Sequence, residues 1–293
     1  SVSTKTSADC AICIKNYQSG CRMKNSIDII VPYWGEFSLL KQTVDSVLAQ
    51  TSKAWHLTIL DDHYPDKTAY NHYKKLNDKR ITYIRHRKNI GITANFNYAI
   101  QHASAPYCMI VGCDDKLLPS YVDTALKNIG EADFYQPRVQ IIDDKSNVYL
   151  PLVDKVKRIL QPKKSSILSG EKLAASLCHG NWLYFPSITW KTNTLKKYSF
   201  DTKYKILEDV IVELTMIIDG ASLYFDMTET FQYRRFAESL SSKEKGKNGI
   251  RFKEEKEVYD NFSDRFNEID WKKAARAAKL RVTSRIHSFL SRF

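Results

Sequence analysis

Two adjacent carboxylates, Asp114 and Asp115, follow the short apolar run Tyr107–Val111 and a glycine. Such a run is typical of a strand buried on both faces of a parallel sheet. In open α/β sheets, ligands bind beyond the carboxyl ends of the strands. Carboxylate oxygens there suit Mg²⁺ or Mn²⁺ holding a diphosphate, because the metal keeps open positions for substrate oxygens. The alternative is an aspartate pair that caps the helix expected after Pro119.

A second carboxylate pair, Glu208 and Asp209, lies at the start of the predicted helix Leu207–Ile218. Backbone N–H groups and the helix dipole favour negative charge at a helix N-terminus, so a carboxylate there stays ionised. An ionised carboxylate can take the proton from a hydroxyl group as that group attacks in a single displacement. The alternative interpretation is simple capping of the helix.

Two further sites could bind a nucleotide base. Asp61 and Asp62 end the predicted strand Trp55–Leu60, and one of them could accept a hydrogen bond from the N–H of a uracil or thymine base. The alternative is an N-cap for the next helix. Pro32 and Tyr33 follow the first predicted strand and could form a shallow shelf for a base, or simply an ordinary turn.

The elements that position these residues alternate between strand and helix. Apolar periodicity predicts strands at Ile27–Val31, Trp55–Leu60, Ile81–Ile84, Tyr107–Val111 and Phe134–Ile142, and helices at Glu36–Gln50, Lys67–Leu76, Gly91–His102 and Tyr121–Ile129. This order favours an α/β protein with a Rossmann-like, doubly wound, mostly parallel sheet.

The second half of the chain is less regular. We expect an irregular connection over 143–164, a helix over Ser169–Cys178, an aromatic strand over Trp182–Trp190, one or two strands over Leu223–Tyr233 and helices from Gly249 onward. Residues 1–22 have no clear periodicity, so we expect a poorly ordered leader or an added expression segment.

Composition and missing motifs exclude several classes. No apolar run approaches the ~18–20 residues that span a bilayer, so we expect a cytoplasmic protein. The net charge is +12, but seven of the basic residues lie in 271–293, so no nucleic-acid-binding surface is implied. The CxxC at Cys10 and Cys13 lacks the four ligands of a zinc site. Neither GxGxxG nor GxxxxGK[ST] follows the first strand, which argues against dinucleotide-binding and P-loop proteins.

Four motifs occur in a telling order: PYWGE after the first strand, LDD after the second, Asn89-x-Gly91 before the third helix, and GCDD-x-x-x-P after the fourth strand. Over roughly Ile27 to Tyr233 the chain resembles a family 2 glycosyltransferase with a GT-A fold. The resemblance divides the chain into a nucleotide-sugar-binding half (23–142), a half that carries the base and acceptor site (143–248) and a helical tail (249–293).

The resemblance also implies residue roles. Asp209 is the expected base and Glu208 supports it, while Asp114 and Asp115 hold Mn²⁺ or Mg²⁺. The residues expected to bind the nucleotide sugar are Pro32, Tyr33, Glu36, Asp61, Asp62, Asn89, Gly91, Asn95, Asp114 and Arg234. Three positions depart from the family pattern: Gly112 replaces a frequent Asp, Asn95 a frequent Arg, and Phe236 a His.

The expected acceptor is a glycan or a polyprenyl-linked glycan, with Trp182 and Asn181 as candidate contacts. The tail carries an apolar stripe from Trp271 to Phe293 among Lys and Arg residues, which suits an anionic membrane surface on the inner face of the cell membrane. The alternative is a helix packed on the protein or on a second subunit of a homo-oligomer.

These features predict an inverting glycosyltransferase that uses a UDP- or dTDP-sugar in bacterial surface polysaccharide or glycolipid assembly. One alternative is a sugar nucleotidyltransferase, although PYWGE is not the Gly- and Arg/Lys-rich loop that such an enzyme needs. The other is a degenerate sugar-nucleotide or glycan-binding module, which Gly112 and Phe236 favour and the intact carboxylate pairs oppose.

Overall fold

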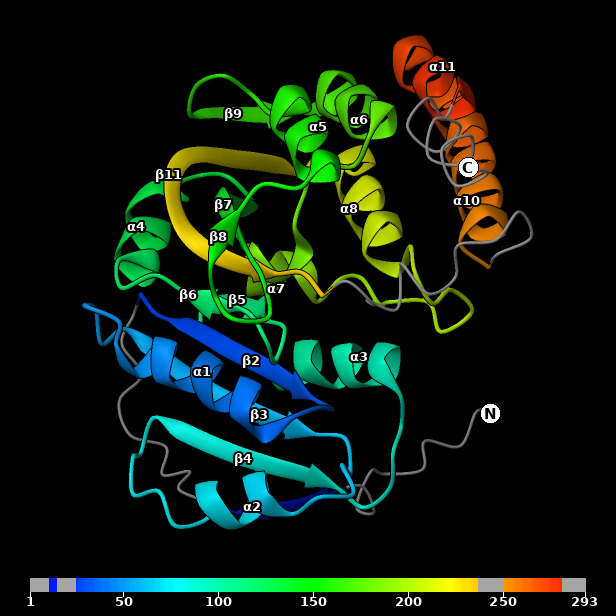
Figure 1. Ribbon diagram of the computed structural model, residues 1–293. Coiled ribbons are helices and arrows are strands. Elements are labelled where there is room, and N and C mark those ends of the chain that lie inside the picture. The colour runs from blue at the N-terminus through cyan, green and yellow to red at the C-terminus, as the bar shows by residue number, and fades with distance from the viewer. Residues whose placement is uncertain (1–10, 15–24, 237–249, 281–293) are drawn as a thin grey trace.

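A single mixed sheet organises the protein (Figure 1). The structure is a computed structural model that describes residues 11–14, 25–236 and 250–280. The strand order is β1-β4-β3-β2-β5-β10-β7-β11-β6, with β8 paired to β7 and β9 paired to β11. The pairings among β2, β3, β4 and β5 and the long pairing of β7 with β11 are parallel, and the remaining pairings are antiparallel. The α/β class expected from the alternating pattern is confirmed.

The first half of the sheet matches the predicted elements closely. Its strands are β2 (Ile27–Tyr33), β3 (Trp55–Asp61), β4 (Ile81–His86) and β5 (Tyr107–Ile110), and its helices are α1 (Phe37–Leu48), α2 (Thr68–Tyr73), α3 (Ile92–His102) and α4 (Tyr121–Asn128). The four strands run parallel in the order β4-β3-β2-β5. Continuous apolar runs predict such strands well because helices cover both faces of the sheet.

The second half is built around two long parallel strands, β7 (Phe134–Ile142) and β11 (Ser222–Arg234). Short strands complete it: β6 (Lys116–Leu117), β8 (Val148–Tyr149), β9 (Ser166–Ser169) and β10 (Thr189–Lys191). Its helices are α5 (Leu152–Leu160), α6 (Gly170–His179), α7 (Thr192–Leu195) and α8 (Glu208–Ile218). β10 lies antiparallel between β5 and β7 and so joins the two halves.

Two predictions in this half were wrong. The segment 143–164 is not irregular, because it forms β8 and α5. The polar and basic composition of this segment and its two prolines, Pro151 and Pro162, had indicated an irregular connection, although both prolines lie outside the helix itself. The aromatic segment Trp182–Trp190 is not one strand: Pro186 has no N–H to donate to a sheet, and a 3₁₀ turn (Phe185–Ser187) precedes the short β10.

Two apolar cores lie on the two faces of the sheet. One joins the sheet to α1, α2 and α4, and its members include Val44, Tyr73 and Val122. The other joins it to α3, α6 and α8, and includes Ile100, Leu177 and Leu214. This arrangement is the doubly wound layering that the sequence predicts.

The C-terminal helices α10 (Ile250–Glu268) and α11 (Lys272–Leu280) pack on the second core (Figure 1). Ala275 and Ala278 are buried there and Trp271 packs against the same cluster. This part of the expected membrane-facing stripe is therefore covered by the protein itself, and residues 281–293 lie outside the described residues. Among the described helices, none is both long and apolar enough to cross a membrane.

The segment 1–22, expected to be a poorly ordered leader, contributes one strand to the sheet. β1 (Ala11–Ile14) pairs antiparallel with β4 at the edge of the first half. The low periodicity of so short a strand explains why the sequence did not predict it.

Candidate active site

Asp114 and Asp115 lie in the tight turn between β5 and β6, beyond the carboxyl end of β5. The two carboxylates converge on the backbone of Gly112. A β-carbon added there would lie 2.6 Å from Asp115 Oδ2 and 2.9 Å from Asp114 Oδ1. Gly112 stands where many family members have the first Asp of the motif. The carboxylates of Asp114 and Asp115 occupy the space that a side chain at this position would need.

The pair has little positive charge to balance it. Burial raises the pKa of Asp114, and burial together with Asp114 raises the pKa of Asp115 well above its usual range. Arg234 is the cation that opposes both shifts. Within the described residues no cluster of three or more acidic, His or Cys side chains could hold a metal. Two carboxylates fit Mg²⁺ or Mn²⁺ if substrate phosphates complete the coordination.

Arg234, at the end of β11, binds the turn that carries Asp114 and Asp115. Its backbone N–H donates to Asp115 Oδ1 (2.8 Å) and its Nε to the carbonyl of Asp114 (2.8 Å). Its Nη1 donates to the carbonyls of Asp143 and Asp144, and its Nη2 to Gln42 and Ser146, as four further contacts. Because every guanidinium nitrogen of this buried side chain is used, Arg234 is a structural clamp in this structure and not an open diphosphate contact.

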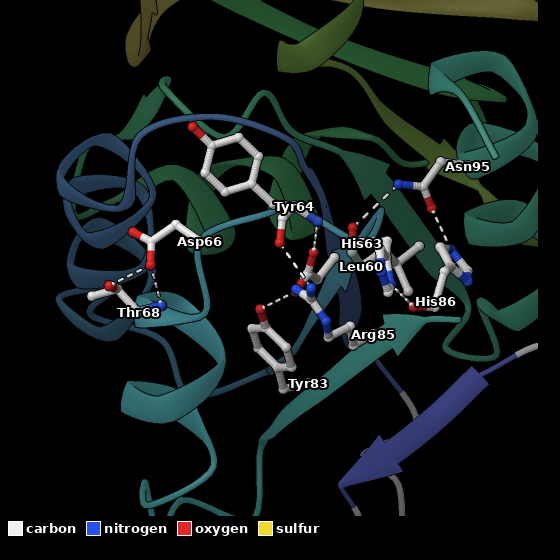
Figure 2. A network of polar contacts seen from close by, with 10 residues as sticks. Leu60, His63, Tyr64, Asp66, Thr68, Tyr83, Arg85, His86 and Asn95 are labelled. Atoms are coloured by element: carbon white, nitrogen blue, oxygen red, sulfur yellow. Dashed lines mark hydrogen bonds and ion pairs between the residues drawn. The ribbon is translucent and has the colours of Figure 1, made fainter. Parts of the chain in front are cut away.

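Asp61, at the end of β3, is bound entirely by neighbouring protein groups. It forms an ion pair with Arg85, and it accepts hydrogen bonds from the hydroxyl of Tyr83 (2.6 Å) and the backbone N–H of Tyr64 (2.8 Å). Figure 2 shows Arg85 beside Tyr83 and Tyr64, where its Nη2 also donates to the Tyr64 carbonyl (2.8 Å). In this geometry Asp61 stabilises the turn after β3, and its buried carboxylate is not exposed to a ligand.

Asp62 joins the second and third nucleotide motifs. Its Oδ1 accepts from the backbone N–H of Ile90 (2.7 Å) and its Oδ2 from that of Gly91 (2.9 Å). Gly91 has a φ of 84°, which favours glycine, and it caps α3. Asn89 is exposed beside this turn. The Asn89-x-Gly91 motif is therefore held in place by the second Asp of LDD.

Asn95 is buried and used inside the protein. Its Nδ2 donates to the carbonyl of Leu60 (3.2 Å) and its Oδ1 accepts from His86 Nε2 (3.1 Å), as Figure 2 shows. The Asn95 side chain therefore connects the end of β3 to the end of β4 through these two hydrogen bonds. This explains how Asn replaces the frequent Arg: the position is a packed junction here and does not reach an open site.

The exposed aromatic surface near the expected base site belongs to residues that the sequence did not single out. Tyr33 is only 1% exposed and its ring packs against Tyr64. Pro32 is also buried, and Glu36 is the exposed N-cap of α1. Trp34 is 50% exposed and meets Tyr64 edge-on with 5.3 Å between ring centroids. Trp34, which follows Tyr33 in the PYWGE motif, was the residue in the sequence that indicated this aromatic surface.

The second carboxylate pair lies at the N-terminus of α8, as predicted. Asp209 Oδ1 accepts from the backbone N–H of Val210 (2.7 Å), and within the described part of the chain its Oδ2 accepts no hydrogen bond. Burial raises the pKa of Asp209, while Lys157 and Arg251 oppose the shift. Glu208 is buried with its Oε2 unpartnered among the described residues, and burial raises its pKa to about 7. A free oxygen on Asp209 is what a base requires.

Helix α5 brings charged groups to Asp209 that the sequence reading missed. Lys157 Nζ donates to the carbonyl of Leu183 (2.8 Å) and lies 4.2 Å from the ring centroid of Tyr184. Burial, with Arg235 nearby, lowers the pKa of Lys157 to about 8. The segment was predicted to be an irregular connection, so no site residue was expected on it.

The same helix binds the end of β11. Arg235 forms a bidentate ion pair with the buried Asp154, through Nε (2.5 Å) and Nη2 (2.9 Å), and Asp154 also accepts from the hydroxyl of Tyr184 (2.6 Å). Burial and the charge of Asp115 raise the pKa of Tyr233. Arg235 lowers this pKa and Asp154 raises it further. Tyr233 thus lies within electrostatic reach of both the Asp114–Asp115 turn and the α5 groups next to Asp209. The adjacent residues Arg234 and Arg235 thus connect the Asp114–Asp115 turn to helix α5, the helix whose Lys157 acts on Asp209.

The two residues expected to contact the acceptor, Trp182 and Asn181, differ in their exposure to solvent. Trp182 is fully buried: its Nε1 donates to Ser176 (3.0 Å) and its ring packs edge-on against Phe225. The expectation that it contacts an acceptor sugar was wrong, because its faces have no open side. Asn181 is partly exposed and donates to Glu213 Oε2 (3.3 Å), one helical turn after Asp209.

Helix α10 holds the chain that leads into α8. The carboxylate of Glu254 accepts hydrogen bonds from the backbone N–H groups of Lys205 (2.9 Å) and Ile206 (3.0 Å). These residues immediately precede the Glu208–Asp209 pair. The C-terminal extension therefore belongs to the framework of the site.

Comparison with known proteins gives consistent results. Residues 28–192 match the family model described as glycosyl transferase family 2. An uncharacterized glycosyltransferase of Methanocaldococcus jannaschii is 27% identical over 197 residues, which cover 66% of this chain and 63% of the relative. A relative from Escherichia coli K12, named "Putative colanic acid biosynthesis glycosyl transferase WcaA", is 27% identical over 208 residues, which cover 67% of this chain and 68% of the relative. The chain thus spans about two thirds of the length of these relatives.

Solved structures of S. aureus TarS are similar in fold. The structure of TarS residues 1–349 superposes with a TM-score of 0.64 at 13% identity and covers 87% of this chain and 71% of TarS 1–349. The same protein in complex with UDP-GlcNAc gives a TM-score of 0.62 at 13% identity, covering 80% of this chain and 65% of that one. This likeness confirms the GT-A fold expected from the sequence.

Proposed function

The chain belongs to glycosyltransferase family 2, and we propose that it transfers a sugar from a UDP- or dTDP-sugar to a glycan or lipid-linked glycan, with inversion at the anomeric carbon. The observation that carries this proposal is that the adjacent residues Arg234 and Arg235 bind Asp115 and helix α5. Lys157 of the same helix opposes the rise in the pKa of Asp209, which places α5 on the side of the second carboxylate pair. One pair suits a diphosphate with its metal, and the other suits an attacking hydroxyl group.

Transfer would proceed as one displacement. The acceptor hydroxyl oxygen bonds to the anomeric carbon while the bond from that carbon to the diphosphate breaks. The hydroxyl proton passes to the free Oδ2 of Asp209, and the nucleoside diphosphate leaves. Lys157 and Arg251, which oppose the rise in the pKa of Asp209, help to keep this carboxylate ionised before attack.

The donor side would use residues from three strand ends. Asp114 and Asp115 would hold Mn²⁺ or Mg²⁺, which neutralises charge on the diphosphate. The exposed Trp34 and the partly exposed Tyr64 offer a surface on which a base can lie, and Asn89 and Gly91 would contribute from the start of α3. Because every guanidinium nitrogen of Arg234 is bonded to the protein, we do not assign the charge of the leaving group to this arginine; a metal held by Asp114 and Asp115 would balance it.

The relatives' names suggest the wider setting. The Escherichia coli relative is named for colanic acid biosynthesis, and a Bacillus subtilis relative for teichuronic acid biosynthesis. We extend this setting, the assembly of a surface polysaccharide or glycolipid, to the present chain as part of the proposal.

Calorimetric titration of UDP, dTDP and GDP tests the donor side. Binding of UDP or dTDP with Mn²⁺, lost on adding EDTA, would support the proposal and name the donor class. Asp114→Asn should lose the metal-dependent binding, and Asp209→Asn should keep it. If the folded protein binds no diphosphate in the presence of metal, the proposal fails and the degenerate binding-module reading takes its place.

A further inference from the structure

Helix α5 exposes a row of apolar side chains to solvent. Leu152 is 71% exposed, Val153 39%, Val156 39% and Ile159 69%. Their spacing of one, four and seven residues from Leu152 places them on one face of the helix. On β8, just before the helix, Val148 is 60% and Tyr149 40% exposed. We call these six residues the α5 stripe. Scattered exposed apolar residues are ordinary, but the four residues of α5 share one helix face, and such a row marks an interaction surface.

The opposite face of α5 lines the acceptor side of the candidate active site. Asp154 binds Arg235 and Tyr184 there, and Lys157 binds the carbonyl of Leu183. In Figure 1, α5 lies in the half of the molecule that contains α6 and α8. Whatever covers the stripe therefore lies beside the place where the acceptor must arrive.

The charge around the stripe points to an anionic surface. Four exposed lysines lie in or next to β8 and α5: Lys145, Lys155, Lys163 and Lys164. The exposed Asp144 precedes them, and between residues 145 and 170 the single acid is Asp154. That acid is buried and paired with Arg235, so it does not offset the charge at the surface. A second copy of this basic chain, with a formal net charge of +12, would meet the same positive region.

We propose that β8 and α5 dock the protein on an anionic lipid bilayer, with the α5 stripe among the acyl chains and the lysines at the head groups. Basic amphipathic helices lie in membrane interfaces in this way. The inference rests on the proposed function for its purpose, since docking here would bring the acceptor side to a lipid-linked glycan. The described part of the C-terminal tail does not offer such a surface, because Ala275 and Ala278 are buried against the protein.

Vesicle flotation without substrate tests the docking. We expect wild-type protein to float with vesicles of equal parts phosphatidylglycerol and phosphatidylcholine. The variant L152S/V156S/I159S should partition about tenfold less. The matched control I269S/L280S removes two apolar residues of the C-terminal helical region, exposed by 41% and 40%, and should float like wild type. Equal flotation of the triple variant and wild type would overturn the proposal, as would failure of wild type to float.

A charge variant tests the choice of an anionic surface. Lys155→Ala and Lys164→Ala should each lower partition to the mixed vesicles about fivefold at low salt. Flotation of wild type on pure phosphatidylcholine as strong as on the mixed vesicles would overturn the electrostatic part. Sedimentation velocity gives the remaining outcome: a dimer that the triple variant abolishes would assign the stripe to a second copy and overturn docking. Titration of UDP needs no vesicles, so failure here and failure of the proposed function are separate results.

Discussion

The carboxylate of Asp62, at the end of β3, accepts a hydrogen bond from the backbone N–H of Gly91, where α3 begins. Its other oxygen accepts from the N–H of Ile90. Two motifs that stand nearly thirty residues apart are thus one structural unit. The geometry of the turn at Gly91, and the position of the exposed Asn89 beside it, depend on a side chain from the neighbouring strand.

Asp62→Ala should damage both folding and donor binding. The variant leaves two backbone N–H groups without partners, which should lower the free energy of unfolding by about 2–4 kcal/mol. The affinity for UDP should fall because the turn at Gly91 is released. Urea denaturation and calorimetry measure the two effects. Asp144→Ala is the control, since only the backbone carbonyl of Asp144 is used in the structure. Unchanged stability of Asp62→Ala would contradict the role of this bond.

Asp209→Asn should reduce turnover by about 10²–10⁴-fold while UDP binding stays the same. The amide keeps the hydrogen bond from Val210 but cannot take a proton. Turnover can be followed as release of nucleoside diphosphate once a donor is identified. Asp264→Asn, on an exposed face of α10, should retain full activity. A fully active Asp209→Asn enzyme would remove Asp209 from the role of base.

Gly112→Ala should be destabilising despite the small size of the added group. Its β-carbon would stand 2.6 Å from Asp115 Oδ2, so the carboxylates must move. We expect a loss of about 1–3 kcal/mol in the free energy of unfolding and weaker Mn²⁺-dependent UDP binding. Gly35→Ala is the matched change, because its nearest neighbour, Cys113 Sγ, would be 3.8 Å away. If both variants behave alike, the carboxylates do not need the space at Gly112.

Glu208 should make stability fall as the pH rises. Its pKa is about 7 in the folded protein against an ordinary value of 4.5, because burial disfavours the charged form. Between these values the folded protein keeps a proton that the unfolded chain has released, so stability is present at low pH and decreases through this window.

Glu208→Gln removes this titration at similar size. The variant should be more stable than wild type at about pH 8, by up to about 3 kcal/mol, and nearly equal at about pH 4. Urea denaturation at both pH values measures the difference. The difference between the two proteins isolates Glu208 from other buried acids such as Glu213. A stability difference that does not change with pH would show that Glu208 is ionised in the folded protein.

The sequence predicted the elements of the first half well and those of the second half poorly, for a physical reason. Strands such as β2 and β3 are buried on both faces, so their apolar runs are unambiguous. Helix α5 exposes most of its apolar residues and buries Asp154. Its segment is polar and basic and contains two prolines, Pro151 and Pro162, so the sequence was interpreted as an irregular connection.

The same limit applies to site residues. Residue type indicated that Asp62, Asp114 and Asp209 matter, but not which groups they bind. Arg234 and Asn95 resembled ligand-binding residues by position, yet all guanidinium nitrogens of Arg234 and both amide atoms of Asn95 bind protein groups. Trp34 and Trp182 show the reverse problem, since one aromatic is exposed and the other buried without a difference in local sequence that decides it.

The short strand β10 has a mechanical consequence. It hydrogen-bonds to β5 on one side and to β7 on the other, so the donor-side and acceptor-side halves share one continuous sheet. A clamshell closure, by which many two-lobed proteins enclose a ligand, would have to break these backbone pairings. We therefore expect any gating of the site to come from segments at the rim of the sheet, with the sheet itself holding the strand ends in place.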